Sequence, residues 1–479
     1  MKRTQSETLI SKIEERELAV IQDPNFLTSP DMRHFASIRK ARTGQFIVLD
    51  TTPYKTYDQI TSFAFTPDSQ RLIYSALSAG KVFLCVNASE IDSYDLIGVG
   101  TFSISPDSQH FAVAASKDNV WFAVIDGQRR ESYQGILENS PVFSPDSQRT
   151  AYGAFDGKQI YVHVDNDVQG PFNAVGNLVF SHDSKHIAYK ASSGDKEAIV
   201  VDGRREREFD SVDTPHFSPD DSLLIYAARS SSKWMTVING YPGSPYDEIF
   251  IGDWSISPKG NRIAHRGKKG KDWYMVVDGI EQGPYEGIAE NSILFSPDGK
   301  RFAFLAGISR KKFGVTLGRD NFAVIDGLSG PIYEKISAIV FSPDSSRYSY
   351  LAIKKGKVFI VLNGVEIGPF DDVWDLYPFS PDSKRTAYAV RVGKQFFVIA
   401  DQDKYGPYDW AGVVEFSPDS RLLTFGARFE NQDRIMVNGQ PGKGYDALYR
   451  LKFDSPDKFH FAARQGSEIL VVDETIELG

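Results

Sequence analysis

The stretch "GPYEGIAENSILFSPDGKRFAFLAG", Gly283 to Gly307, holds two apolar runs separated by the polar turn Ser296-Pro297-Asp298-Gly299. Pro fixes φ at the second position of a type I turn, and Ser, Asp and Gly suit the other positions. The flanking runs "ILF" and "RFAFLA" are rich in residues that favour strands. The stretch therefore predicts two β-strands joined by a tight turn.

The same turn recurs along the chain and defines an internal repeat. Its twelve copies begin at Ser29, Thr66, Ser105, Ser144, Ser181, Ser218, Ser257, Ser296, Ser342, Ser380, Ser417 and Ser455. Successive copies are 37, 39, 39, 37, 37, 39, 39, 46, 38, 37 and 38 residues apart. In eight copies an aromatic residue follows the proline position by seven residues: Tyr74, Tyr152, Tyr189, Tyr226, Phe304, Tyr350, Tyr388 and Phe425.

Each repeat also carries a β-branched run that ends in Asp-Gly or Asn-Gly, such as "FAVIDG", followed by a short segment such as "GPYEGI". Asp-Gly after a strand-like run is a strong hairpin signal, because both turn positions need a positive φ. One repeat thus reads as four strands: strand a before the Ser-Pro-Asp turn, strand b after it, strand c as the β-branched run, and strand d after the Asp-Gly turn. A repeated four-stranded unit of about 38 residues predicts an all-β fold built from β-propeller blades.

The repeat also carries a resemblance to a known family. "FSPDGKRFAFLAG" and "FSPDSKRTAYAV" resemble the repeat of TolB-like, WD-repeat-like β-propeller proteins of bacteria, from about residue 25 to residue 479. The resemblance implies a propeller that serves mostly as a binding or scaffolding module.

Twelve blades exceed the roughly four to eight blades of one propeller, so we expect two tandem rings. The expected organisation is an N-terminal helical segment over residues 1–24, a propeller over residues 25–248 and a second propeller over residues 249–479. Rings of five plus seven or eight plus four blades stay open. Residues 4–20 predict an amphipathic helix with a capping box from Thr4 to Glu7. The one insertion, Ile308 to Asp320, falls between strands b and c of its blade.

Composition narrows the function classes. The 479 residues include 41% hydrophobic and 24% charged residues, with a net charge of −9, which argues against broad binding to nucleic acid. Cys85 is the only cysteine, so no disulfide framework and no cysteine-based zinc site is expected. The N-terminus has no apolar core of signal-peptide length, and no segment of the sequence approaches the roughly 20 apolar residues that a membrane span needs. We expect a cytoplasmic protein with no membrane, nucleic-acid or cofactor partner.

Catalytic and metal-binding patterns are weak. Turn chemistry explains the aspartate of every Ser-Pro-Asp turn without a ligand, and Lys259 replaces it in one repeat. The eight histidines show no ligand spacing, and His265 takes the place of a packed aromatic residue, so we predict no metal site. No Gly-x-Ser-x-Gly motif is present. The alternative function is a glycosidase-like propeller that uses channel carboxylates, with Asp253, Asp375 and Glu415 as candidates.

The loops between strands b and c become basic in the third quarter of the chain. Their cationic residues are Arg266, Lys268, Lys269, Lys271, Arg310, Lys311, Lys312, Arg319, Lys354, Lys355 and Lys357, followed by Arg391 and Lys394. In the sequence, only Asp272 and Asp320 offset them. On an acidic protein, such a surface favours an acidic protein or peptide partner, whereas the alternative is a set of ordinary solvated hairpin loops.

Further candidates for the same face come from matched crossings between repeats. One crossing contains Glu138 and Asn139, and its match contains Glu290 and Asn291. Trp121 and Trp273, at the start of strand c, are candidates for aromatic contacts beside them. The sequence therefore predicts a non-catalytic interaction scaffold that recognises a partner through the loop face of a propeller. It does not predict the oligomeric state.

Overall fold

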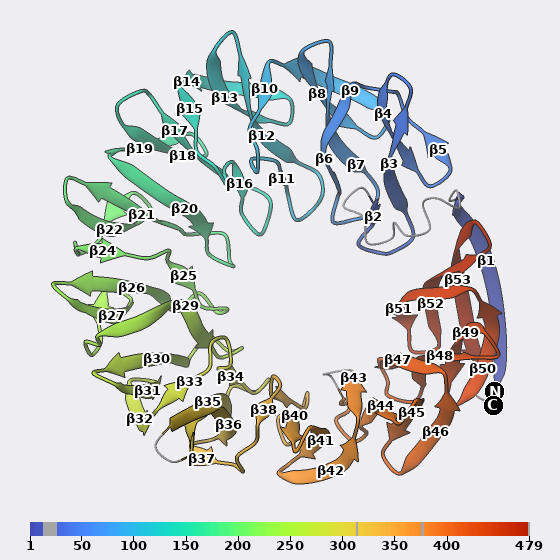
Figure 1. The fold of residues 1–479 in the computed structure, drawn as a ribbon. Coiled ribbons are helices and arrows are strands. Elements are labelled where there is room, and N and C mark those ends of the chain that lie inside the picture. The colour runs from blue at the N-terminus through green and yellow to red at the C-terminus, as the bar shows by residue number, and fades with distance from the viewer. Residues whose placement is uncertain (13–25, 313–314, 375–377, 478–479) are drawn as a thin grey trace. The chain divides into compact units, whose positions relative to one another are not determined.

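The computed structural model describes residues 1–12, 26–312, 315–374 and 378–477. These residues form twelve antiparallel sheets, each a four-stranded blade whose strand a is in places broken into two short pieces (Figure 1). The predicted all-β propeller fold of twelve blades is confirmed. The described residues form no helix, and so contain none that is long and apolar enough to cross a membrane.

The blades fall into two compact units. The N-terminal unit is Glu14–Pro245, and the C-terminal unit combines Tyr246–Gly479 with Met1–Ile13. Each unit contains six blades. The division into tandem rings over residues 25–248 and 249–479 stays a prediction.

The N-terminal unit contains blades 1 to 6, each written here from strand a to strand d. Blade 1 contains β2 (Phe26–Thr28), β3 (Phe35–Ala41), β4 (Gly44–Leu49) and β5 (Thr52–Pro53). Blade 2 contains β6 (Gln59–Phe65), β7 (Leu72–Ser78), β8 (Lys81–Val86) and β9 (Ser89–Tyr94). In blade 3, strand a is formed by β10 (Leu96–Ile97) and β11 (Ser103–Ile104), and the other strands are β12 (Phe111–Lys117), β13 (Val120–Ile125) and β14 (Gln128–Tyr133). In blade 4, strand a is formed by β15 (Gly135–Ile136) and β16 (Val142–Phe143), and the other strands are β17 (Thr150–Phe155), β18 (Ile160–Val164) and β19 (Asp167–Phe172). Blade 5 contains β20 (Ala174–Phe180), β21 (Ile187–Ser193), β22 (Lys196–Val201) and β23 (Arg204–Arg205). In blade 6, strand a is formed by β24 (Ser211–Val212) and β25 (His216–Phe217), and the other strands are β26 (Leu224–Ser230), β27 (Lys233–Ile238) and β28 (Tyr241–Pro242).

The C-terminal unit contains blades 7 to 12 in the same order. Blade 7 contains β29 (Glu248–Ile256), β30 (Ile263–Lys269), β31 (Asp272–Val277) and β32 (Ile280–Tyr285). In blade 8, strand a is formed by β33 (Gly287–Ile288) and β34 (Leu294–Phe295), and the other strands are β35 (Phe302–Lys312), β36 (Val315–Ile325) and β37 (Leu328–Ser329). In blade 9, strand a is formed by β38 (Lys335–Ile336) and β39 (Val340–Phe341), and the other strands are β40 (Tyr348–Lys354), β41 (Lys357–Leu362) and β42 (Val365–Phe370). Blade 10 contains β43 (Asp372–Trp374), β44 (Ala387–Val392), β45 (Gln395–Ala400) and β46 (Asp403–Tyr408). Blade 11 contains β47 (Trp410–Phe416), β48 (Leu423–Phe429), β49 (Gln432–Val437) and β50 (Gln440–Tyr445). Blade 12 contains β51 (Ala447–Ser455), β52 (Lys458–Gln465), β53 (Glu468–Glu477) and, as its strand d, β1 (Lys2–Lys12).

The hairpins between strands c and d form as their sequences predict. In blade 3, Ile125 pairs with Gln128, and the two residues between them, Asp126 and Gly127, have φ values of 51° and 76°. Both turn residues thus adopt the left-handed conformation that a two-residue hairpin of the right twist requires. Asp and Asn tolerate this conformation better than other side chains, which explains their place before glycine.

The hydrophobic core lies between successive blades. One cluster joins Val162 and Val164 of blade 4 to Ile187 and Tyr189 of blade 5, and other clusters join later neighbours in the same way. The repeated aromatic residue of strand b is buried in all eight copies that carry it. A blade has two apolar faces, so its stability depends on a neighbour at each face.

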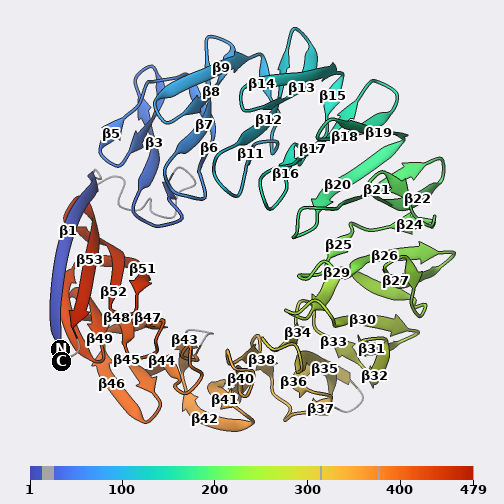
Figure 2. The same ribbon diagram turned by 180° about the vertical axis from the view of Figure 1, so that it is seen from behind.

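The N-terminal residues form a strand and not the predicted helix. β1 pairs with β53 in antiparallel register from Lys2 opposite Glu477 to Lys12 opposite Glu468, and completes blade 12. Figure 2 shows β1 running along β53 at the edge of that blade. The prediction failed because the open edge of β53 satisfies the backbone groups of β1, and this tertiary pairing overrides local helix propensity. The rest of the expected helix, residues 13–20, lies outside the described residues.

Candidate interaction surface

The Ser-Pro-Asp turns link neighbouring blades. In blade 8 the Ser296 hydroxyl donates to Asp298 Oδ1 at 2.7 Å, and the N–H of Lys300 donates to the same oxygen at 3.0 Å. The N–H of Asp298 donates to the Ser345 hydroxyl of blade 9 at 2.9 Å. The N–H of Lys300 and the Ser296 hydroxyl lower the pKa of Asp298 to about 2. The carboxylate is therefore ionised and engaged in its own turn, which is a structural role.

The same link recurs in both units. Equivalent N–H to hydroxyl bonds are Asp31–Ser69, Asp68–Ser108, Asp107–Ser147, Asp146–Ser184, Asp344–Ser383 and Asp382–Ser420. In blade 7, where Lys259 replaces the aspartate, the Ser257 hydroxyl donates to Asn261 Oδ1 at 3.2 Å. The sequence-based interpretation of the turns as backbone chemistry agrees with these contacts.

The crossings from strand d to the next strand a contact the turns between strands b and c. Asp371 in the crossing before blade 10 forms an ion pair with Lys357 of blade 9, and its Oδ2 accepts the N–H of Gly393 at 2.6 Å. Asp95 forms an ion pair with Lys81 and accepts the N–H of Asp118 at 2.8 Å in the same way. The crossings and the b–c turns therefore share one face of the blades, as expected from the sequence.

Most of the cationic residues of blades 7 to 9 have acidic partners. The ion pairs are Lys268–Glu248, Lys269–Glu281, Arg310–Asp320, Lys354–Glu366 and Lys357–Asp371. The expectation that only Asp272 and Asp320 offset these charges is wrong. Pleated strands bring Glu248, Glu281 and Glu366 to the lysines from sequence positions 12 to 20 residues away. The b–c loop sequences alone do not show this proximity.

Arg266 and Trp273 take part in packing. Arg266 lies within β30 with only 3% of its surface exposed, and its Nη1 donates to the carbonyl oxygen of Ile288 at 2.8 Å. Its guanidinium is 3.3 Å from Glu290 Oε1 and 5.2 Å from the centre of the Trp273 ring. Lys268 Nζ lies 5.4 Å from the same ring. The prediction that Arg266 lies in an open loop is therefore wrong, because Arg266 belongs to β30, in which residues 263–267 are all buried.

Three lysines remain at the tips of the b–c turns. Lys271, Lys355 and Lys394 are exposed in the turns of blades 7, 9 and 10, and their ammonium groups form no ion pair with the described part of the chain. The N–H of Lys355 donates to Glu334 Oε1 at 2.9 Å, which holds the turn while leaving the side chain in solvent. These three side chains can meet an anionic partner without breaking an internal ion pair.

The insertion in blade 8 lengthens one hairpin. β35 and β36 pair from Ala303–Ile325 out to Lys312–Val315. A Cβ on Gly307 would come within 2.6 Å of Arg319 Cδ, so the Arg319 side chain lies across this glycine. The side chains of Lys311 and Lys312 lie outside the described residues. Beside the hairpin, an open pocket of about 320 Å³ is lined by Arg310, Asp320, Ile332, Tyr333, Glu334, Lys354 and Lys355.

The matched crossings divide between the two units. Glu138, Asn139 and Trp121 belong to the N-terminal unit, whereas Glu290, Asn291 and Trp273 belong to the C-terminal unit with the cationic residues. Glu138 and Glu290 are exposed at the second position of their turns, and both tryptophans are half-buried in strand c. Only the second set therefore lies in the same unit as the lysine turns.

Of the candidate glycosidase carboxylates, the structure describes the side chain of Glu415 alone. Glu415 is half-buried on β47, while the side chains of Asp253 and Asp375 lie outside the described residues. His265 is buried against Tyr246, with ring centres 5.9 Å apart, and burial lowers its pKa to about 4. His265 is thus a neutral core residue, as its position in the repeat indicates.

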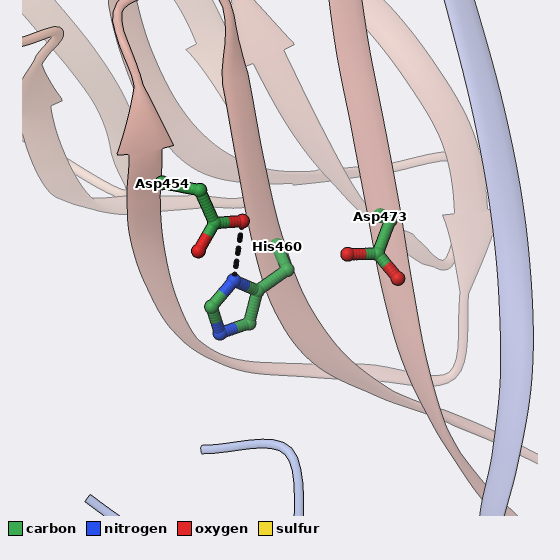
Figure 3. A group of neighbouring side chains, drawn as sticks. All are labelled: Asp454, His460 and Asp473. Atoms are coloured by element: carbon green, nitrogen blue, oxygen red, sulfur yellow. Dashed lines mark hydrogen bonds and ion pairs between the residues drawn. The ribbon is translucent and has the colours of Figure 1, made fainter. Parts of the chain in front are cut away.

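One group among the described residues could offer three metal ligands. Asp454, His460 and Asp473 come from the adjacent strands β51, β52 and β53, with their ligand atoms within 4.8 Å of one another. Figure 3 shows the His460 ring directed at Asp454, where Nδ1 lies 2.9 Å from Oδ2. Each of the three residues also takes part in a further interaction. These contacts already engage the group, so we assign no metal to it.

Comparisons with known proteins find only distant structural similarity. No protein-family model matches the sequence, and no curated protein matches it. TolB from Acinetobacter baumannii is 18% identical over 46% of this chain and 63% of its own, with a TM-score of 0.24. The β-propeller domain of Cps50 (Swd1) from Myceliophteria thermophila is 11% identical over 64% of this chain and 99% of its own, with a TM-score of 0.25. The match thus spans less than two thirds of the TolB chain, and both likenesses concern the fold alone.

Proposed function

We propose that this protein is a non-catalytic interaction scaffold whose C-terminal unit binds an acidic segment of a partner protein. The surface proposed is the lysine-turn surface, defined as Lys271, Lys355 and Lys394 at the tips of three b–c turns. One observation supports it above the others: these ammonium groups project into solvent while their neighbours Lys268, Lys269, Lys354 and Lys357 are paired within the blades.

The internal pairs define the roles of the two kinds of lysine. A paired lysine must give up its carboxylate before it can contact a ligand, so it contributes little to a new ionic contact. An exposed, unpaired ammonium group loses little hydration and attracts an anionic segment from a distance of about one Debye length, roughly 8 Å at physiological salt. Binding should therefore depend on the lysine-turn surface and weaken as salt rises.

An apolar contact is available beside Lys355. Ile332 is 57% exposed and lines the pocket between the long hairpin and blade 9. Its neighbours in the lining are the cations Arg310, Lys354 and Lys355 and the anions Asp320 and Glu334. A partner segment that combines acidic residues with one apolar side chain fits this mixture better than a purely anionic polymer.

The proposal can be tested with a defined acidic probe. A fluorescein-labelled peptide of about eight glutamates is titrated with the full chain, and anisotropy is followed at low and physiological salt. We expect the glutamate peptide to bind, the matched glutamine peptide to bind much less, and salt to weaken the complex. The triple variant Lys271→Glu, Lys355→Glu, Lys394→Glu should lose this binding.

A matched control separates this surface from charge in general. Lys158 is exposed in the b–c turn of blade 4, in the other unit, and Lys158→Glu changes the net charge in the same direction. This variant should bind the glutamate peptide as the wild type does. Equal binding by the triple variant and the wild type would overturn the assignment of the acidic segment to the lysine-turn surface.

A further inference from the structure

Three crossings of the chain are built on one turn. The turns are Gly98–Thr101 in blade 3, Leu137–Ser140 in blade 4 and Ala289–Ser292 in blade 8. In each, the hydroxyl of the fourth residue donates to the carbonyl oxygen of the first at 2.8 Å. The third residue has a positive φ in each: Gly100 at 71°, Asn139 at 56° and Asn291 at 51°.

The blade 3 turn differs from the other two at its exposed second position. Glu138 and Glu290 occupy this position in blades 4 and 8, whereas blade 3 carries Val99, which is 93% exposed. The backbone of the turn does not require an apolar residue there, because two glutamates satisfy it equally. Leu96, three residues earlier, is 55% exposed. One exposed apolar residue is ordinary, but an apolar group beside a cleft is typical of a binding surface.

Val99 and Leu96 line a cleft of about 560 Å³ within the N-terminal unit. Its walls come from β6, β7 and β8 of blade 2 and from the crossing into blade 3. The apolar side chains that line it with them are Phe63, Leu77, Val82, Leu84, Ile97 and Phe102. The cleft therefore offers a site for a bulky apolar group, with an exposed apolar lip at Val99.

The polar groups of the cleft narrow the ligand class. The hydroxyls of Thr61 and Ser62 each lie 2.7 Å from the Ser75 hydroxyl, so these three groups satisfy one another. Asp95 is the charged lining residue, and its carboxylate is held by Lys81 and by the N–H of Asp118. A basic group on the ligand can share this carboxylate, which still has free lone pairs, whereas an acidic group would be repelled.

The topology favours an extended peptide over a compact ligand. β6 is the edge strand of the blade 2 sheet, and four consecutive residues, Thr61 to Ala64, line the cleft. An edge strand carries backbone N–H and C=O groups that face away from its single neighbour, and an extended segment can use them.

We infer that this cleft, which we call the Val99 cleft, binds an extended peptide segment of a partner protein that inserts one bulky apolar side chain and places a basic residue beside Asp95. The inference stands apart from the lysine-turn surface, because it concerns another unit and a partner segment of opposite charge. A scaffold with both surfaces would hold two different segments.

The test uses a set of labelled peptides of about six residues, each with one Leu, Ile, Phe or Trp next to a Lys, and matched sets in which the Lys is Glu or the apolar residue is Asn. Binding to the full chain is measured by anisotropy up to about 1 mM peptide. We expect the apolar-Lys peptides to bind best. Val99→Glu should weaken their binding about tenfold or more, because the buried contact with a valine side chain is lost.

Folding is controlled within the same chain. Val99→Glu places in this turn the residue that the two matched turns carry, so its thermal midpoint should equal that of the wild type. Glu138→Val, the reverse change in blade 4, should leave peptide binding unchanged. The inference is overturned if no apolar-Lys peptide binds, if the apolar-Glu peptides bind equally well, or if Val99→Glu binds as the wild type does.

Discussion

The backbone N–H of Asp298 in blade 8 donates to the hydroxyl of Ser345 in blade 9, at 2.9 Å. Ser345 is 4% exposed and has a φ of 67°. The link therefore joins two blades at a buried point where a side chain, and not a β-ladder, makes the connection. Its recurrence accounts for the serine that follows most of the Ser-Pro-Asp turns, and in blade 6 the carboxylate of Asp221 accepts the N–H of Asp183 at 2.6 Å in the same way.

Replacing this serine should loosen the contact between the two blades. Ser345→Ala leaves the Asp298 N–H without its acceptor, which should cost about 1 to 2 kcal/mol of unfolding free energy. Ser345→Gly should cost less, because glycine adopts the positive φ more readily. Urea unfolding of both variants measures the difference, with the exposed Ser230→Ala as the control. Unchanged stability in Ser345→Ala would mean that the link does not hold the blades together.

The turn carboxylate gives the protein a defined acid response. The folded-state pKa of Asp298 is about 2, below the ordinary value, so its ionised form is favoured by folding. Its stabilising effect is present above the unfolded pKa near 4 and is lost as pH falls through about 2. Asp298→Asn should therefore be less stable than the wild type at neutral pH, and this difference should shrink as pH falls. Thermal midpoints across an acid pH series measure it, and a constant difference would contradict the prediction.

The closing strand of blade 12 depends on a buried ion pair. Arg3 Nε lies 2.5 Å from Glu474 Oε2, and the Glu474 side chain is 1% exposed. Arg3→Ala should cost about 3 kcal/mol, because it leaves a buried carboxylate without its cation. Hydrogen exchange of the β53 amides should rise in this variant as β1 detaches. Lys2→Ala removes a neighbouring pair in which both side chains are more than half exposed, and should cost no more than about 0.5 kcal/mol.

The penalty of Arg3→Ala should also depend on pH. Burial raises the pKa of Glu474 and Arg3 opposes this, so loss of Arg3 raises that pKa further. A carboxyl group with a raised folded-state pKa loses stability as pH rises through the interval between its unfolded and folded pKa values. The penalty should therefore be largest near neutral pH and smaller below about pH 4. A penalty that grows as pH falls would contradict this assignment.

The blades could be predicted from the sequence, because the Ser-Pro-Asp turn, the Asp-Gly hairpin and the aromatic residue of strand b are local signals that recur at a nearly constant interval. The strand at Lys2–Lys12 could not be predicted in this way, since its partner β53 lies more than 450 residues away in the sequence. Local propensity carries no information about such a pairing.

The candidate surface was predicted only in part. The basic character of the b–c turns is visible in the sequence, but the pairing of Lys268 with Glu248 or Lys354 with Glu366 depends on which strands lie side by side. A signal was nevertheless present: acidic residues recur in strand d and in the crossings, such as Glu281 and Asp371. The exposed Val99 could also have been found by aligning its turn with the two "ENS" turns.

The measurement that tests the scaffold proposal most directly is affinity capture from the source lysate with three baits: the wild type, the variant Lys271→Glu, Lys355→Glu, Lys394→Glu, and the control Lys158→Glu. We predict a captured protein with an acidic segment that the wild type and Lys158→Glu retain and the triple variant loses. Retention of the same proteins by all three baits would contradict the proposal that the lysine-turn surface binds the partner.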